Sequence, residues 1–442
     1  MKNIRVVILF FLFTNLCLSQ TGWYQVNSGT SKYLTSIFFV NLNTGFSVGS
    51  AGTLLVTNNT GTSWQRINLN DTNYSLRKIY FKDQTTGYIL GSSPVGFPVP
   101  PDTLHSRVYK TTDGGLHWFV ELQRVLDVYF NNIEFVNSST GYMSGGLYSV
   151  GPNKIFKTTN SGNSWVEIQT GVNGAILSQK FTDANTGYLG IMNAIYKTTD
   201  GGTTWNPVFE NAGSYFNLVK DITFINPNTG FAAGGYYPDT LSKNRFVIKT
   251  TNAGVTWNYL VNDNSNSMIN SITVLSEALI YAGGTANPAP YNLNNGFIIR
   301  STNGGITWSN ESIPTAFPLS DIKNNNNRGF AVGFNGVIYK KDNIVSITQI
   351  STGVPSSINL YQNYPNPFNP ETTIKFDISK AGFISLKVYD ISGKEVQNLF
   401  NGVKEAGSYQ LKFDGANLNS GVYFYKLLTN GTAITKSMVL AK

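Results

Sequence analysis

An eight-residue segment that ends in tryptophan recurs through most of the chain, and this repeat constrains the fold more than any other feature. Each copy begins with Thr or Ser, carries Asp or Asn at its third position and Gly at its fifth, and closes on Trp. The copies occupy residues 57–64, 111–118, 158–165, 198–205, 250–257 and 301–308. Counted from Trp23, successive tryptophans lie 40 to 54 residues apart. This period is typical of a propeller blade with four strands.

A second mark, a turn followed by glycine and an aromatic residue, lies 11 to 24 residues before the start of most segments. It occurs at Gly45-Phe46, Gly87-Tyr88, Gly141-Tyr142, Gly187-Tyr188, Gly230-Phe231 and Gly329-Phe330, with a degenerate copy at 276–281. The 43 Gly and the β-branched and aromatic runs between them favour strands and turns. We therefore predict an all-β protein with a seven-bladed β-propeller over residues 20–343.

The last expected blade, residues 319–343, has no tryptophan segment, whereas Trp23 has no blade of its own. We expect Gly22 to Asn27 to pair as the outer strand of that blade, with Trp23 at the ring closure. Such pairing closes the ring and removes exposed sheet edges.

Within each segment the residue types describe a turn with a buried anchor. The Asp or Asn accepts backbone N–H groups, the Gly adopts a conformation that other residues avoid, and the Trp buries a large apolar surface. These segments resemble the Asp boxes of sialidases, sortilin-type receptors, xyloglucan-active propellers and Ycf48-like photosystem II assembly factors. The resemblance implies a peripheral, structural role for Asn59, Gly61, Trp64, Asp113, Gly115, Trp118, Asn160, Gly162, Trp165, Asp200, Gly202, Trp205, Asn252, Gly254, Trp257, Asn303, Gly305 and Trp308.

The N-terminus has the pattern of a secretory signal peptide over residues 1–19. Lys2 and Arg5 precede an apolar run from Val6 to Phe13, which is too short to span a bilayer. We expect cleavage after Ser19 and no transmembrane segment in the mature chain. The formal net charge is +8, but the lysines recur about once per repeat and form no basic cluster, so we expect no nucleic-acid partner.

The last part of the chain is predicted to be a separate unit. A linker over 344–357 precedes short alternating strands punctuated by Gly, Asn and Pro over 358–442, a pattern of a small antiparallel β-sandwich. Tyr364-Pro365-Asn366-Pro367-Phe368-Asn369-Pro370 and Gly421-Val422-Tyr423-Phe424-Tyr425 resemble the type A C-terminal sorting domain of the type IX secretion system of Bacteroidetes. The resemblance implies export through the periplasm to the outer membrane, with the secretion machinery as partner of this tail.

The connections between the second and third strands of each expected blade are the long and variable ones, at 92–107, 145–154, 235–245 and 285–296. They lie on the face opposite the tryptophan segments, and variable loops on a rigid scaffold commonly carry binding sites. We expect a ligand-binding face that includes Phe97, His105, Arg107, Tyr148, Tyr236, Tyr237, Arg245 and Tyr291. The expected ligand is a glycan or a surface protein.

An enzyme of the Asp-box class, a glycoside hydrolase or lyase, is the alternative, and a structural subunit of a cell-surface apparatus is a second one. A glycosidase needs two well-placed carboxylates, for which the candidates are Asp102, Asp239 and Asp321. The arginines of sialidase catalysis are not apparent. With two histidines and one cysteine in the chain, we expect no metal site and no cofactor.

Overall fold

The computed structural model describes residues 22–93, 105–126, 128–146, 153–210, 217–236, 245–263, 265, 267–286, 295–315, 317–325, 327–342, 348–351, 353–415, 418–429 and 431–442. These residues form antiparallel strands and one short 3₁₀ turn, η1 (Phe334–Gly336). Within them, no helix has the length and apolar character that crossing a membrane requires.

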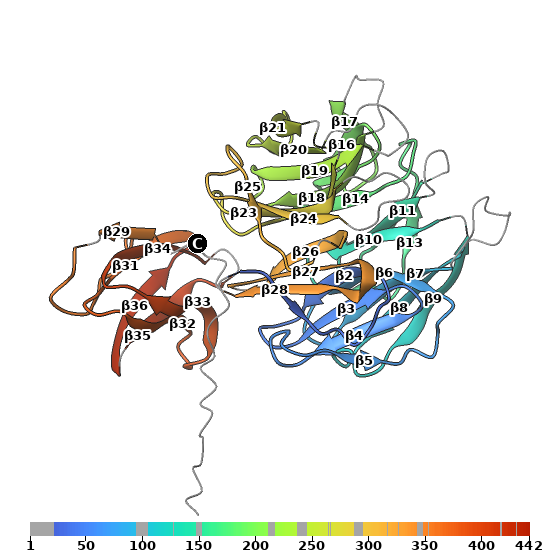
Figure 1. Cartoon of the computed structure of the whole chain (residues 1–442). Coiled ribbons are helices and arrows are strands. Elements are labelled where there is room, and N and C mark those ends of the chain that lie inside the picture. Colours follow the sequence, from blue (N-terminus) through green and yellow to red (C-terminus); the bar gives the residue numbers. More distant parts are fainter. Residues whose placement is uncertain are drawn as a thin grey trace, which may run out of the picture.

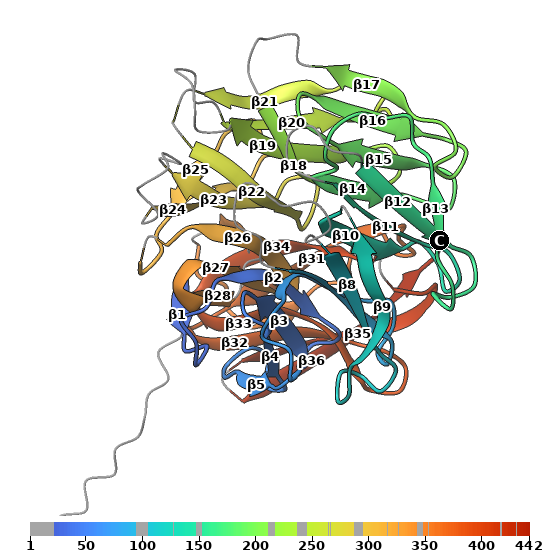
Figure 2. The same ribbon diagram turned by 90° about the vertical axis from the view of Figure 1, so that its right-hand side faces the viewer.

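Most of the chain folds into four-stranded antiparallel sheets, each built from consecutive strands (Figures 1 and 2). The first three sheets contain β2 (Leu34–Phe39), β3 (Gly45–Gly49), β4 (Thr53–Thr57) and β5 (Gln65–Ile67); β6 (Ser75–Phe81), β7 (Gly87–Ser92), β8 (His105–Thr111) and β9 (Phe119–Leu126); and β10 (Phe130–Phe135), β11 (Gly141–Gly146), β12 (Asn153–Thr158) and β13 (Val166–Ile168).

The next sheets follow the same order. They contain β14 (Ser178–Phe181), β15 (Gly187–Gly190), β16 (Ala194–Thr198) and β17 (Asn206–Glu210); β18 (Asn217–Phe224), β19 (Gly230–Tyr236), β20 (Arg245–Thr250) and β21 (Asn258–Asp263); and β22 (Ser267–Val274), β23 (Ile280–Ala286), β24 (Gly296–Ser301) and β25 (Ser309–Glu311). The last two of these sheets are linked through one pair, Gly235 with Met268.

The final sheet of this part joins the two ends of the propeller sequence. It contains β26 (Leu319–Asn325), β27 (Arg328–Gly333) and β28 (Ile338–Asp342), and β28 pairs antiparallel with β1 (Tyr24–Val26). Trp23 is 5% exposed and packs edge-on against Tyr281 at a centroid distance of 6.1 Å. The segment expected to close the ring therefore supplies the outer strand of this sheet.

The first strand of each sheet lies innermost, and these inner strands contact one another in turn. β2, β6, β10, β14, β18, β22 and β26 form a closed series, because β26 also contacts β2. Figure 2 looks along the axis about which the sheets are arranged. Hydrophobic clusters fill the spaces between neighbouring sheets, for example Tyr188 and Trp257 with Ile222. The arrangement is a β-propeller in which each sheet buries its faces against its neighbours.

The Gly-aromatic mark has a steric cause. A Cβ atom on Gly87 would lie 2.6 Å from the ring of Phe81, the last residue of the preceding strand, and Gly45, Gly141, Gly187 and Gly230 meet a Phe ring in the same way. Before it, an Asn or Asp side chain closes the turn: Asp83 Oδ1 accepts the N–H groups of Thr85 and Thr86 at 2.8 and 2.7 Å. The mark therefore encodes the first turn of each sheet.

The C-terminal part forms two further antiparallel sheets that share one hydrophobic cluster. One contains β29 (Thr348–Ser351), β30 (Asn359–Leu360), β31 (Glu371–Ile378) and β34 (Gly407–Asp414); the other contains β32 (Gly382–Tyr389), β33 (Glu395–Lys404), β35 (Gly421–Thr429) and β36 (Thr432–Leu440). They lie to the left of the propeller in Figure 1 and behind it in Figure 2. Asn327 Nδ2 donates to the carbonyl of Leu399 at 2.9 Å, which joins the β26–β27 turn to β33.

Candidate functional site

A β-bulge occurs at the same place in six of the inner strands and shapes the centre of the propeller. The extra residues are Thr35, Arg77, Asn131, Lys220, Asn270 and Ser320. Several of their side chains bond to the next sheet. Thr35 Oγ1 and Asn270 Nδ2 donate to the carbonyls of Leu76 and Leu319, each at 2.7 Å. A bulge changes the direction in which side chains point, and each of these bulges directly precedes a polar residue near the centre of the propeller.

Pairing with the second strand places each following residue in a common register. The residues at this register position, which follow the bulge in six strands and begin β14, form what we call the polar ring: Ser36, Lys78, Asn132, Ser178, Asp221, Ser271 and Asp321. The next residue is Ile in six strands and Gln179 in β14; we call this set the isoleucine ring. It comprises Ile37, Ile79, Ile133, Gln179, Ile222, Ile272 and Ile322.

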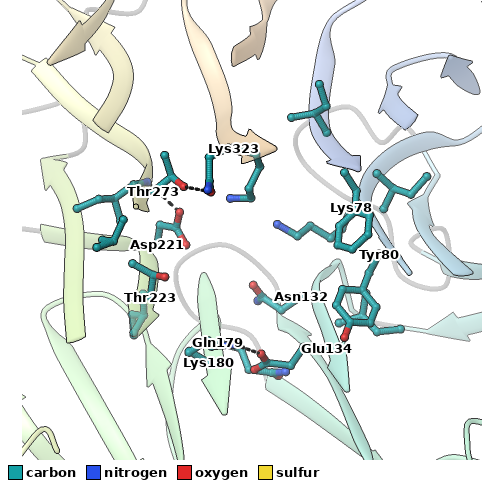
Figure 3. A pocket seen from close by; sticks show the side chains of 18 residues that line it. Lys78, Tyr80, Asn132, Glu134, Gln179, Lys180, Asp221, Thr223, Thr273 and Lys323 are labelled. Carbon is teal, nitrogen blue, oxygen red and sulfur yellow. Dashed lines mark hydrogen bonds and ion pairs between the residues drawn. The ribbon is translucent and has the colours of Figure 1, made fainter. Parts of the chain in front are cut away.

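The inner strands enclose a central cavity of about 310 Å³, next to a smaller one of about 140 Å³. Side chains from all the inner strands line the larger cavity (Figure 3). Lys78, Asn132 and Asp221 line both, so the two cavities meet at the polar ring. Together the linings carry five cationic side chains (Arg77, Lys78, Lys180, Lys220 and Lys323) against three carboxylates (Glu134, Asp221 and Asp321). The cavity is therefore charged, with an excess of positive groups.

Asp321 is 4% exposed and is fully engaged with its surroundings. Its Oδ2 accepts the Ser36 hydroxyl and the Ile37 N–H, each at 3.1 Å, and its Oδ1 accepts the Ser271 hydroxyl at 3.0 Å and pairs with Lys323 Nζ at 2.8 Å. Burial alone would raise the pKa of Asp321, but the nearby lysines and these hydrogen bonds outweigh it and lower the pKa to about 2.

The other two carboxylates bridge neighbouring sheets in the same manner. Asp221 Oδ2 accepts the Ser271 hydroxyl at 2.8 Å and the Ile272 N–H at 2.9 Å. Glu134 Oε1 accepts the Phe181 N–H at 2.5 Å, and its Oε2 pairs with Lys180 Nζ at 2.8 Å. Glu134 raises the pKa of Lys180 against the opposing effect of burial. Each acid thus accepts a backbone N–H from the following sheet.

Three polar groups of the lining make no such bonds within the described part of the chain. Lys78 Nζ has no hydrogen-bond or ion-pair partner there, although its charge helps to lower the pKa of Asp321, and its side chain extends into the cavity in Figure 3. The buried Nδ2 of Asn132 and Oε1 of Gln179 are also without a hydrogen-bond partner among these residues. An unpaired polar atom in a buried position costs free energy unless a ligand or water satisfies it.

The residues predicted for the ligand-binding face fall into two groups. Phe97, Tyr148, Tyr237 and Tyr291 lie outside the described residues, as do the carboxylate candidates Asp102 and Asp239. His105 and Tyr236 belong to β8 and β19, and only their backbone positions are described.

Arg107 and Arg245, the remaining two, are held by protein groups. Arg107 pairs with Asp71 and stacks on the Tyr74 ring, with Cζ 4.2 Å from the centroid. Arg245 Nη2 lies 3.0 Å from Asp263 Oδ2, and its Cζ lies 5.3 Å from the Phe297 centroid. Both arginines therefore have local partners that already use part of their bonding capacity.

The tryptophan segments lie away from the cavity, at the turn between the third and fourth strands. Asp113 Oδ1 accepts the Thr111 hydroxyl at 2.8 Å and the His117 N–H at 3.0 Å, and Trp118 Nε1 donates to the Gly115 carbonyl at 3.1 Å. Gly114 N donates to the Thr85 carbonyl at 2.8 Å, so the segment contacts the first turn of its own sheet on one face.

The glycine of each segment also contacts the preceding sheet. A Cβ atom on Gly254 would lie 2.5 Å from Tyr188 Cε1, and one on Gly115 would lie 2.6 Å from Phe46 Cζ. Gly61 and Gly162 meet Phe330 and Tyr88 in the same way, whereas Gly305 meets Leu260. In these four sheets the aromatic residue of a Gly-aromatic mark thus reaches the segment of the next sheet. This contact, in addition to the positive φ of these glycines, explains the residue type.

Sequence reasoning missed the inner strands, although they carry a signal. Each expected first strand contains a four-residue pattern that ends just before the first turn. The copies read Ser-Ile-Phe-Phe, Lys-Ile-Tyr-Phe, Asn-Ile-Glu-Phe, Ser-Gln-Lys-Phe, Asp-Ile-Thr-Phe, Ser-Ile-Thr-Val and Asp-Ile-Lys-Asn, from residues 36, 78, 132, 178, 221, 271 and 321. Aligning them reveals the variable polar positions that line the cavity. Among the described residues, no cluster of His, Cys, Asp or Glu suits a metal ion.

Comparison with known proteins supports both expected resemblances. Residues 362–441 match the family described as the secretion system C-terminal sorting domain, and residues 16–97 match the family described as photosynthesis system II assembly factor YCF48. The photosystem II assembly lipoprotein Ycf48 of Nostoc sp. is 25% identical over 292 residues, which cover 49% of this chain and 85% of that protein. The resemblance of the propeller to Ycf48-like proteins and of the tail to type IX sorting domains is confirmed.

Solved structures show the same fold. A structure described as YCF48 bound to D1 peptide has a TM-score of 0.54 at 17% identity and covers 74% of this chain and 98% of that one. YCF48 from Cyanidioschyzon merolae has a TM-score of 0.53 at 20% identity, covering 73% and 99%. The GH74 xyloglucanase from Xanthomonas campestris has a TM-score of 0.54 at 11% identity, covering 80% and 59%.

The class of protein follows from these findings. It is an all-β chain with a Ycf48-like β-propeller and a C-terminal sorting domain. The sorting domain points to secretion and export to the cell surface, with the secretion machinery as its partner.

Proposed function

We propose that this protein is an exported binding module whose seven-bladed β-propeller binds an extended segment of another protein. Seven inner strands in a closed series, with β1 completing the last sheet, support the seven-bladed assignment. Two sheets around one hydrophobic cluster support a β-sandwich for residues 358–442, to which β29, within the expected linker 344–357, adds an edge strand. The sorting domain delivers the propeller across the outer membrane after removal of a signal peptide over residues 1–19.

The proposal rests on a contrast between two sets of polar side chains in the central cavity. Its carboxylates are engaged in bonds between sheets, whereas Lys78, Asn132 and Gln179 offer polar atoms that the described protein groups leave unused. Rigid walls with a few convergent polar groups are typical of binding sites. A structure of the same fold is described as bound to a peptide, which favours a protein ligand.

A glycoside hydrolase is the second candidate, because the xyloglucanase shares the fold and two carboxylates lie close together. Ser271 Oγ lies 2.8 Å from Asp221 Oδ2 and 3.0 Å from Asp321 Oδ1, so the two carboxylates share its single proton. A glycosidase, however, needs one carboxyl group that is protonated at working pH. The pKa of Asp321 is about 2, and both groups accept backbone N–H groups. We assign them to the scaffold, and we place the Asp-box residues there as well.

The test presents the protein, lacking only residues 1–19, to peptide and polysaccharide panels in parallel, and released reducing ends are assayed in the polysaccharide wells. Retention of peptides without release of sugar ends is the expected result. Release of sugar ends would contradict the proposal and restore the hydrolase alternative. Retention of polysaccharides alone would favour a glycan-binding propeller, and no retention on either panel would favour a structural subunit.

A further inference from the structure

Gln179 departs from an otherwise uniform position of the fold. The six other inner strands carry Ile at this register position. Gln179 is as buried as a core residue, at 9% exposure, and it lines the cavity. Its Nε2 donates to the carbonyl of Tyr142 at 3.3 Å, which orients the amide, while Oε1 has no partner among the described residues. An isoleucine would avoid this unpaired oxygen, so the glutamine calls for a ligand-based explanation.

Two hydrogen-bond donors lie on the wall of the same cavity. Lys78 of β6 and Asn132 of β10 occupy neighbouring positions of the polar ring, on adjacent sheets that are in contact. Asn132 Nδ2 is buried and unpaired among the described residues, and Lys78 projects into the open space (Figure 3). An ammonium group and an amide N–H₂ in this arrangement suit a carboxylate, which accepts several hydrogen bonds.

The carboxylates of the opposite wall already have protein partners. Asp221 and Asp321 there are held by Ser36, Ser271 and two backbone N–H groups, and Lys323 is paired with Asp321. Arg77 and Lys220 line the smaller cavity and add to its positive excess. An anion is therefore attracted into the cavity by its overall charge and meets its unused donors at Lys78 and Asn132.

We propose that the cavity receives a carboxylate carried by the bound protein segment. Lys78 Nζ and Asn132 Nδ2 donate to the carboxylate, and Gln179 Oε1 accepts a backbone N–H of the same segment. The acceptor distinguishes a peptide from an inorganic anion, which has no N–H to offer. This inference rests on the proposed function and names the chemical group that the cavity recognises.

The test uses three Gly-Ser hexapeptides, titrated into isotope-labelled protein that lacks only residues 1–19. One has a free C-terminal carboxylate, one is amidated and contains a single internal Glu, and one is amidated without any acidic residue. The readout is the side-chain amide signal of Gln179, assigned by its loss in Gln179→Ile. At least one acidic peptide is expected to shift this signal, and the neutral peptide is expected not to. The comparison between the acidic peptides shows which carboxylate binds.

Two variants separate recognition from folding. Lys78→Met is expected to weaken binding of the acidic peptide at least about tenfold, the usual loss for a charge-assisted hydrogen bond. Gln179→Ile is expected to weaken it by a few fold while raising the melting temperature, because the unpaired oxygen is removed. Lys32→Met, which changes an exposed lysine on a loop, is the matched control and leaves affinity unchanged.

The results distinguish failure of the carboxylate site from failure of peptide binding as such. Equal binding of the neutral peptide, or unchanged affinity in Lys78→Met, would overturn the carboxylate site while leaving a peptide-binding propeller intact. A lower melting temperature in Gln179→Ile with unchanged affinity would make Gln179 a structural residue and would also overturn it. Absence of binding by all three peptides at millimolar concentration would count against the site, and the peptide panel described above would then decide the proposed function independently.

Discussion

Asp321 Oδ2 accepts the backbone N–H of Ile37 at 3.1 Å and thereby links the last sheet of the propeller to the first. The same bond recurs between two consecutive sheets, where Asp221 Oδ2 accepts the N–H of Ile272 at 2.9 Å. Both carboxylate acceptors belong to the polar ring, and both N–H donors belong to the isoleucine ring. The junction that closes the propeller is thus secured by an inner-strand carboxylate as well as by the outer pairing of β1 with β28.

Asp321→Ala is expected to destabilise the protein by about 3 kcal/mol, because it leaves the Ile37 N–H and the Lys323 ammonium without their partner. Asp321→Asn keeps an acceptor and should cost less. Denaturant unfolding of both variants measures the difference. Lys32→Ala, at an exposed position, serves as a control for changes in net charge. An Asp321→Ala variant as stable as the wild type would show that this bond does not hold the junction.

The low pKa of Asp321 predicts a particular acid response. Because the pKa is about 2 in the folded protein and about 3.9 in an unfolded chain, the ionised group stabilises the fold above about pH 4. That contribution, roughly 2.5 kcal/mol, is lost as the pH falls from about 4 toward 2. Thermal melts across this range should therefore show a steeper decline for the wild type than for Asp321→Asn. Parallel curves would contradict the assignment.

Removal of residues 20–27 should lower the melting temperature sharply. The deletion eliminates β1, exposes the edge of β28 and removes Trp23 from its cluster with Tyr281 and Tyr339. Trp23→Ala should have a smaller effect in the same direction, about 3 kcal/mol for a buried Trp. Calorimetry of the three proteins tests this order. An unchanged melt after the deletion would show that closure does not depend on β1.

Gly254→Ala is expected to cost about 3 kcal/mol. Its φ of +74° disfavours any side chain, and the new Cβ would meet the Tyr188 ring. Gly171→Ala is the matched control, since φ is +64° and nothing lies within 4 Å of the added atom; it should cost about 1 kcal/mol. Similar unfolding free energies for the two variants would mean that the contact between neighbouring sheets contributes little.

The sorting tail gives a prediction at the level of the cell. In a host with a type IX secretion system, a chain truncated before residue 358 should remain in the periplasm, while the full chain reaches the cell surface or medium. A passenger protein fused to residues 344–442 should be exported in the same host. Fractionation followed by immunoblotting measures both. Export of the truncated chain would show that the C-terminal tail is not the export signal.

The parts of the fold that depend on turn chemistry could be predicted from the sequence, because a turn is encoded by a few adjacent residues. Asp113, Gly115 and Trp118 form one such local unit. The pairing of β1 with β28 could be predicted because Trp23 precedes the first blade while the last blade lacks a tryptophan. The cavity could not be predicted in the same way. Its walls combine single residues, such as Lys78 and Gln179, from strands that lie about a hundred residues apart.

The lysines of the third strands show why charge patterns alone mislead. One lysine per repeat suggests a dispersed, solvated charge, yet Lys197 Nζ bonds to the Ala253 carbonyl at 2.7 Å and lies 5.7 Å from the Tyr188 centroid. Lys157 makes the equivalent contacts with Gly201 and Tyr142. These lysines therefore connect neighbouring sheets. Their regular spacing follows from the repeat. Their role in joining neighbouring sheets is apparent only from the packing of one sheet against the next.

A crystal structure with a bound acidic peptide would show directly whether the propeller binds a protein segment at its central cavity. We expect electron density for a carboxylate beside Lys78 and Asn132, with a peptide N–H directed at Gln179 Oε1. A peptide seated elsewhere on the propeller, with the cavity filled by solvent alone, would contradict it.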